Sequence, residues 1–119
     1  MADLVTRIGG PERLHEILTR FYERLAADVI VGFFFVGHDL GAIIDGQHAF
    51  LCWAFGAADE LHARHPRDAH RSLVPILRGH FDRRMTILRE CLEAEGLAAA
   101  DIEAWLKVER SMRAVVQAR

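Results

Sequence analysis

Long hydrophobic runs and blocks of like charge are both missing from this sequence of 119 residues. The N-terminal stretch MADLVTRIGG has an acid at position 3 and only isolated apolar residues, so we expect neither a signal peptide nor a membrane anchor. Fifteen Lys and Arg against seventeen Asp and Glu leave a formal net charge of −2, with no basic block that could neutralise phosphates. We therefore expect a soluble, cytoplasmic protein that binds neither nucleic acid nor a membrane.

Cysteine is scarce as well, since only Cys52 and Cys91 are present. They lie far apart, each within an apolar helical pattern, which favours buried free thiols in a reducing compartment over a disulfide. A hydrophobic fraction of 51% is enough for the chain to bury a core of its own. We expect residues 1–119 to form a single domain.

Apolar residues recur at helical spacing, and this pattern predicts four main helices, over residues 11–27, 40–55, 79–95 and 101–117. The run VIVGFFFV, residues 29–36, has the composition of a strand, but no other segment could pair with it. We interpret it as a buried turn or short helix packed into the core. The polar stretch 59–75 contains two prolines and should be largely loop, with at most a short helix near 68–73. The expected fold class is all-α.

The stretch HARHPRDAH, residues 62–70, raises the question of a metal site because it holds three histidines. A structural zinc site needs four ligands, usually with cysteine thiolates, and both cysteines lie on other elements. Pro66 also disfavours a helical conformation at His65, so His62 and His65 are not expected to share a helix face. The cluster alone gives no reason to expect more than surface histidines.

Two polar side chains occupy apolar helix faces. Tyr22, the only tyrosine, lies on the apolar face of the first predicted helix, and Gln47 lies on the apolar face of the second. Buried hydroxyl and amide groups need hydrogen-bond partners. They could bond each other or a backbone carbonyl inside the core, or both could point at a polar ligand held between the helices.

A set of ordered motifs gives the sequence a family resemblance. The motifs are IGG (8–10), FYERLAAD (21–28), FFV (34–36), GQHAF (46–50), AFG (54–56), DAHRSLV (68–74) and HFDR (80–83). In this order they resemble the truncated haemoglobins, most closely group I, and the resemblance extends from Ile8 to Val116. It implies a truncated globin fold, a two-over-two helical sandwich around haem b, in which the proximal helix is reduced to a loop and one turn.

The resemblance also implies roles for particular residues. His70 matches the proximal iron ligand, so a single histidine of the cluster would bind the metal. Tyr22 and Gln47 match the distal hydrogen-bond donors, and Ile43 falls at the distal position that many globins fill with histidine or glutamine. Phe35 matches the phenylalanine that packs flat on the haem. Further haem contacts are expected from apolar residues that a plain helical core would equally produce: Phe34, Phe50, Leu51, Ile76, Phe81 and Met85.

The sequence departs from the family pattern at several points. It has Gly56-Ala57 where the family usually has two glycines, and ELHARHP replaces a Tyr-Xaa-Gly element before His70, so that His62 or His65 could compete for iron. Arg84 stands where the other two groups often have tryptophan beside the haem. It could contact a haem propionate or meet water, and the general rarity of buried arginine favours water.

The implied function is reversible binding of O₂, NO and CO. Conversion of NO to nitrate, with an external reductase, is the expected turnover, in which Tyr22 and Gln47 would act on the ligand. A non-catalytic gas sensor or oxygen store is the alternative, followed by a haem-free helical interaction module. The absence of Cys-Xaa-Xaa-Cys-His predicts that the haem is extractable. A monomer or weak homo-oligomer is expected.

Overall fold

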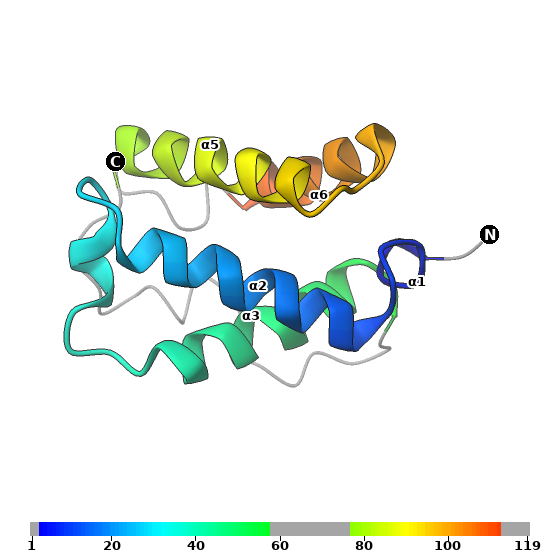
Figure 1. Ribbon diagram of the computed structural model, residues 1–119, viewed down its shortest axis with the longest axis horizontal. Helices are drawn as coiled ribbons and strands as arrows, with labels where there is room; N and C mark the ends of the chain where they lie inside the picture. The colour runs from blue at the N-terminus through cyan, green and yellow to red at the C-terminus, as the bar shows by residue number, and fades with distance from the viewer. Residues whose placement is uncertain (1–2, 58–76, 113–119) are drawn as a thin grey trace.

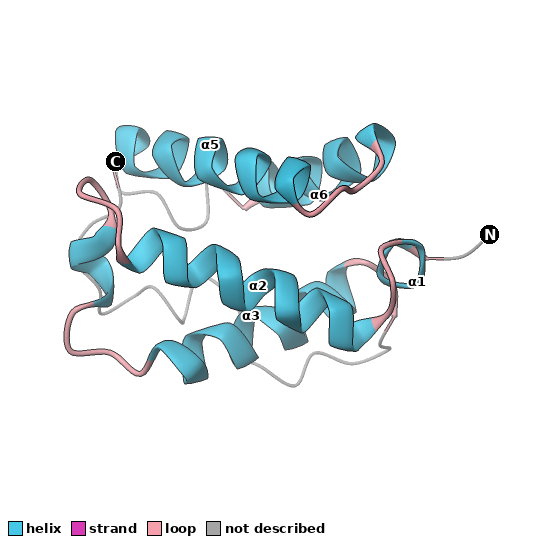
Figure 2. Cartoon of the chain, in the orientation of Figure 1, coloured by secondary structure: helices cyan, strands magenta, loops and turns pink. Residues whose placement is uncertain are grey.

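Helices make up most of the part of the chain that the computed structural model describes, residues 3–57 and 77–112, and no strand occurs within these ranges. The elements are α1 (Leu4–Arg7), α2 (Pro11–Ala26), η1 (Gly32–Phe35), α3 (Leu40–Ala54), α5 (Arg78–Ala94) and α6 (Ala99–Ser111), where η1 is a 3-10 helix. Figure 2 shows short loops between α1 and α2, between α2 and η1, between η1 and α3, and between α5 and α6. The all-α prediction is confirmed.

The four long helices form two layers. Figure 1 shows α2 and α3 in one layer and α5 and α6 in the other, and α2 contacts α5 across the two layers. One face of α2 supplies the centre of the core, because Leu14, Ile17, Leu18 and Phe21 are fully buried at helical spacing. From the opposite layer, the fully buried Trp105 meets Phe55 edge to face, with ring centroids 5.6 Å apart.

Local sequence signals explain where the helices begin. Gly10 adopts φ of 100° immediately before Pro11, a backbone conformation that other residues rarely take, and Pro11 supplies the preset φ of a first helical residue. Asp39 caps α3 by accepting a hydrogen bond from the backbone N–H of Ala42 at 3.2 Å. The predicted starts at residues 11 and 40 are therefore confirmed.

The other boundaries agree less closely. Helix α5 begins one residue before the predicted 79, and α6 begins at Ala99 instead of residue 101. The short helix α1, in which Asp3 accepts from the backbone N–H of Thr6, was not anticipated. Cys52 and Cys91 are free thiols as predicted, although only Cys91 is buried.

The prediction that residues 29–36 pack into the core is wrong in part. The segment does contain a short helix, η1, but Val29 is 96% exposed and Val36 is 79% exposed. Phe33, within the turn, is also 47% exposed. A single helical turn can bury only part of its surface: Val31 and Gly32 are buried, and Phe34 and Phe35 pack partly buried against the core.

Several predicted features lie outside the described residues. They include the loop at 59–75, the final part of the last predicted helix, and the side chains of His62, His65, His70 and Ile76. Within the described ranges, no helix has the length and apolar character needed to cross a membrane.

Candidate functional site

Tyr22 projects from α2 into the interior between the two helix layers. Its side chain is buried, and its ring meets the rings of Phe21 and Phe35 edge to face, with centroids 5.2 and 6.0 Å away. The phenolic oxygen accepts a hydrogen bond from Nη2 of Arg84 at 3.3 Å. The structure thus brings together Tyr22 and Phe35, two of the predicted site residues, and adds an arginine.

Glu109 on α6 gathers the other polar groups of this region. It is 5% exposed, and its carboxylate accepts from Nη1 of Arg84 at 2.7 Å. It also accepts from Nε1 of Trp105 at 3.1 Å and from Nε2 of Gln47 at 3.3 Å. Three donors therefore satisfy a buried acceptor that would otherwise be costly to desolvate. We call Tyr22, Gln47, Arg84, Trp105 and Glu109 the buried polar network.

The prediction that Arg84 meets water is wrong. Its side chain is only 20% exposed, its guanidinium lies 5.1 Å from the centroid of the Phe21 ring, and Glu109 neutralises it. Burial by itself would lower the pKa of Arg84, but the charge of Glu109 and the bonds to Glu109 and Tyr22 outweigh that effect and raise it. Arg84 therefore keeps its charge inside the protein, paired with a carboxylate of the same chain.

Glu109 was missed by the sequence analysis, although a signal for it was present. Ile102, Trp105 and Leu106 are buried at helical spacing, and a residue at position 109 continues the same face. A glutamate on an apolar face requires a cationic or donor partner. Arg84 was the corresponding anomaly on α5.

For a simple core, we expected Tyr22 and Gln47 to hydrogen-bond each other or a backbone carbonyl. They do neither: Tyr22 bonds Arg84 and Gln47 bonds Glu109, which are both charged side chains. Burial raises the pKa of the Tyr22 hydroxyl, and the positive charge of Arg84 offsets part of this rise. The phenol thus remains protonated at neutral pH. Since arginine cannot accept a hydrogen bond, the phenolic proton of Tyr22 is available to another acceptor.

The apolar residues expected at the site divide into two groups. Three are buried: Phe50 and Leu51 belong to the core cluster, where a plain helical core would also place them, and Phe81 is buried outside that cluster. Four are only partly buried against that core: Phe34, Phe35, Ile43 and Met85. The ring of Phe34 stacks on Phe33 and lies 5.0 Å from that of His80, which joins η1 to α5.

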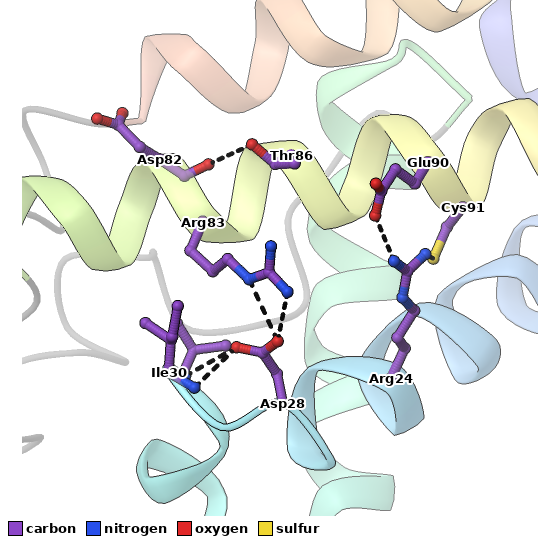
Figure 3. Close-up of polar contacts among 9 residues, drawn as sticks. Arg24, Asp28, Ile30, Asp82, Arg83, Thr86, Glu90 and Cys91 are labelled. Carbon is purple, nitrogen blue, oxygen red and sulfur yellow. Dashed lines mark hydrogen bonds and ion pairs between the residues drawn. The ribbon is translucent and has the colours of Figure 1, made fainter.

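The corner between α2 and η1 is tied to α5 by an ion pair (Figure 3). Oδ1 of Asp28 accepts from Nε and Nη2 of Arg83 at 3.2 and 2.8 Å. Its other oxygen accepts from the backbone N–H groups of Ile30 and Val31, at 3.0 and 3.2 Å. The hydrogen bonds from Arg83 hold the pKa of Asp28 below its ordinary value. This corner fixes the course of the chain into η1, and with it the position of Phe35.

Gly32 allows the same corner to close tightly. A Cβ at this position would lie 2.6 Å from the backbone oxygen of Ala26, at the end of α2. Any larger residue would push η1 away from α2.

Within residues 3–57 and 77–112, no group of three or more His, Cys, Asp or Glu could hold a metal ion, and the expected ligand His70 lies outside these ranges.

Comparison with known proteins agrees with this geometry. The family model described as bacterial-like globin matches residues 3–118. A group 1 truncated haemoglobin of Chlamydomonas moewusii is 32% identical over 114 residues, covering 95% of this chain and 67% of the relative. One from Synechocystis sp. is 36% identical over 85 residues, covering 69% of this chain and 68% of the relative.

Solved structures show the same fold. The truncated haemoglobin of Tetrahymena pyriformis in its Fe(III) form superposes with a TM-score of 0.89 at 23% identity, covering 99% of this chain and all of that one. The 2/2 haemoglobin of Synechococcus sp., solved in the cyanomet state with covalently attached haem, gives a TM-score of 0.85 at 26% identity and covers 96% of this chain and 95% of that one. The two layers of Figure 1 are therefore the two-over-two globin sandwich.

The described residues fit a haem. Phe34, Phe35, Ile43 and Met85 offer apolar surface that is incompletely buried, and Phe33 and Leu77 are about half exposed, at 47% and 52%. Beside them, Tyr22 holds a hydroxyl proton that the network does not use. On the family match and these residues together, the chain belongs to the bacterial-like globins and is a truncated haemoglobin, most similar to group I, with haem as its cofactor.

Proposed function

We propose that the protein reversibly binds O₂, NO and CO, with His70 as the iron ligand and with Tyr22 and Gln47 as hydrogen-bond donors to the bound gas. Ferrous haem supplies the site at which a diatomic ligand binds and gains electron density. Donors that are already oriented in a water-poor interior stabilise this density without reorganising. The observation that carries the proposal is the buried Tyr22 hydroxyl, whose oxygen accepts from Arg84 so that its proton is left to donate.

The Tetrahymena structures lend further support to these positions. They include variants in which a tyrosine is replaced by phenylalanine and either of two glutamines by glutamate, 21 and 25 residues after the tyrosine in that chain's numbering. Tyr22 is separated from Ile43 and from Gln47 by the same intervals. We infer that Tyr22 and Gln47 are equivalent to two of these residues, and that Ile43 replaces the first glutamine by an apolar side chain.

His70 is proposed as the iron ligand on its motif, DAHRSLV, since it lies outside the described residues. Its imidazole must be neutral to donate to iron, and a carbonyl or carboxylate bonded to its other ring nitrogen would fix the ring. Replacing His70 with alanine should remove the ferrous-CO absorption band or sharply lower haem occupancy. Full occupancy with an unchanged band would assign the iron ligand to another residue.

Conversion of NO to nitrate is the turnover we propose for this site. One NO, one O₂ and one electron give one nitrate ion, so a reductase must return one electron to the iron in each cycle. Gas sensing or oxygen storage would use the same binding site without that supply of electrons. Steady-state nitrate formation from NO and O₂ in the presence of a chemical reductant tests the proposed turnover, and no more than one nitrate per haem despite excess reductant would contradict it. Membership of the globin family overturns the haem-free alternative.

We also propose that residues 1–119 act as one domain in the cytoplasm, as a monomer or weak homo-oligomer, and that the haem is extractable. The globin model spans residues 3–118, which supports a single domain. Sedimentation velocity over a range of concentrations and extraction of haem with acidic butanone test the last two points.

The test of the distal assignment is the rate of O₂ dissociation in Tyr22→Phe. Loss of one hydrogen bond in a buried site costs about 1–3 kcal/mol, equivalent to a roughly 5- to 150-fold faster dissociation. Thr86→Val is a suitable control, because it removes an exposed hydroxyl that donates to the carbonyl of Asp82 one turn back on α5. Stopped-flow rates in Tyr22→Phe equal to those of the parent protein would contradict the assignment.

A further inference from the structure

We infer that Arg84 and Glu109 are positioning residues for gas binding, an internal ion pair that determines which atoms Tyr22 and Gln47 present to the ligand. The inference rests on the proposed donor role of Tyr22 and Gln47. Neither charged residue needs to touch the ligand for this effect. Each acts through one neutral donor, and they are joined to each other at 2.7 Å.

Arg84 determines whether the Tyr22 hydroxyl acts as a hydrogen-bond donor or acceptor. A phenol can both donate and accept, so a neighbour that only donates fixes the phenolic oxygen of Tyr22 as the acceptor in their hydrogen bond. Nη2 of Arg84 bonds the phenolic oxygen at 3.3 Å, and a guanidinium offers no acceptor in return. The proton must therefore point elsewhere. The adjacent positive charge also makes this hydroxyl a stronger donor.

Glu109 controls the orientation of the Gln47 amide in the same way. A carboxylate accepts hydrogen bonds and donates none, so Gln47 can approach it only through Nε2, as the contact at 3.3 Å shows. Bonding through the amide nitrogen leaves the second N–H of Gln47 for a ligand and prevents the amide from flipping. An amide side chain at position 109, which can both donate and accept, would bond the Gln47 amide in either orientation.

The ion pair is itself held rigidly. Glu109 is anchored by Nε1 of Trp105 on its own helix, and the Arg84 guanidinium lies against the ring of Phe21. Arg84 is on α5 and Glu109 is on α6, so the pair comes from one helix layer while the two neutral donors come from the other. Charged groups in one layer thereby orient the donors of the opposite layer.

The principal test is Glu109→Gln in the haem-loaded protein. This near-isosteric change permits Gln47 to present either its nitrogen or its oxygen. We expect O₂ dissociation to accelerate by about 2- to 10-fold, which corresponds to weakening a single hydrogen bond. We expect a single C–O stretching band for the ferrous CO complex of the parent protein and at least two bands for Glu109→Gln. A purely structural role for Glu109 would not produce this splitting.

Arg84 is tested with two substitutions. Arg84→Lys keeps the charge and a donor, so it should retain most of the parent O₂ dissociation rate, whereas Arg84→Met should not. The matched control is the Arg89–Glu103 pair, which also joins α5 to α6, at 2.8 Å, but is about half exposed. Arg89→Met and Glu103→Gln should leave both the dissociation rate and the infrared band unchanged.

A double variant covers the case in which a single substitution prevents folding. Arg84→Met/Glu109→Met removes both charges and leaves no unpaired ion, and it should combine normal haem loading with fast O₂ dissociation and more than one C–O band. Parent-like values in this variant and in Glu109→Gln would overturn the inference. If Tyr22→Phe still changed the rate, the inference alone would fail. If Tyr22→Phe were parent-like as well, the proposed function would fail with it.

Discussion

Replacing Glu109 with methionine provides a sharp test of how the charges inside this protein are balanced. The substitution keeps a side chain of similar length but removes the acceptor for Arg84, Gln47 and Trp105. Arg84, only 20% exposed, would then lie inside the protein without a counter-ion. Removing one partner of a buried ion pair costs about 3–5 kcal/mol, mostly because the remaining charge is uncompensated.

The size of this loss is large relative to the stability of the whole domain. At roughly 0.05–0.15 kcal/mol per residue, a chain of 119 residues has about 6–18 kcal/mol of unfolding free energy. Glu109→Met should therefore remove about a sixth of it or more. Replacing both members, Arg84→Met/Glu109→Met, should recover most of the loss, because exchanging a buried ion pair for packed apolar side chains is often neutral or stabilising.

The assay is urea unfolding of the ferrous CO form at neutral pH, followed by far-ultraviolet circular dichroism and by haem absorbance. Protein and haem concentrations must be the same for all variants, because haem binding adds to the apparent stability. Glu103→Met, which breaks an exposed pair, should leave the midpoint unchanged. A Glu109→Met variant as stable as the parent, or a double variant less stable than the single one, would refute the argument that Arg84 is trapped in the interior.

Three further predictions concern other residues. Gly32→Ala should destabilise the protein by about 1–3 kcal/mol, since the added Cβ would meet a backbone oxygen. Gly79→Ala should not, because a Cβ at that position meets no other part of the described structure within 4 Å. Thermal unfolding of both variants measures the difference. Because Arg83 depresses the pKa of Asp28, the stability due to this pair is fully present above the ordinary pKa of 3.8 and is lost as the pH falls through the lower pKa of the folded state. Asp28→Asn should therefore flatten the acid side of a plot of melting temperature against pH. An unchanged slope would count against the pair. Tyr22 is the only tyrosine and burial raises its pKa, so the midpoint of the phenolate absorbance of the folded protein should lie above pH 10. Arg84→Met should raise this midpoint further, because it removes the positive charge beside the phenol. A midpoint at or below 10.0 would show an exposed phenol.

The helices could be predicted from the sequence because each depends on a pattern repeated over many residues. The buried face of α2 repeats every three to four residues from Leu14 to Leu25, about three turns, and Gly10-Pro11 marks the start of the helix. The segment 29–36 was harder, since composition alone cannot show which side of a single turn meets the core. Val29 and Val36 look as apolar as Val31, yet only Val31 is buried.

The polar contacts of the site were beyond the reach of pattern analysis. Tyr22 and Gln47 could be recognised as anomalies on apolar faces, but their partners depend on how α5 and α6 are rotated against the other layer. Arg84 and Glu109 are 25 residues apart and belong to residue types that usually face solvent. Each stands out on its own helix, but only the three-dimensional pairing shows that one accounts for the burial of the other.

The arrangement of the buried polar network links the stability of the fold to the geometry of the site. Each of the four long helices contributes to it: Tyr22 from α2, Gln47 from α3, Arg84 from α5, and Glu109 from α6. Apolar contacts tolerate small sliding motions between layers, but hydrogen bonds between these groups depend strongly on distance and angle. The network therefore favours one register of the two layers over neighbouring ones. Since the same bonds orient Tyr22 and Gln47, a shift between the layers would alter the donors offered to the gas even if the core remained well packed.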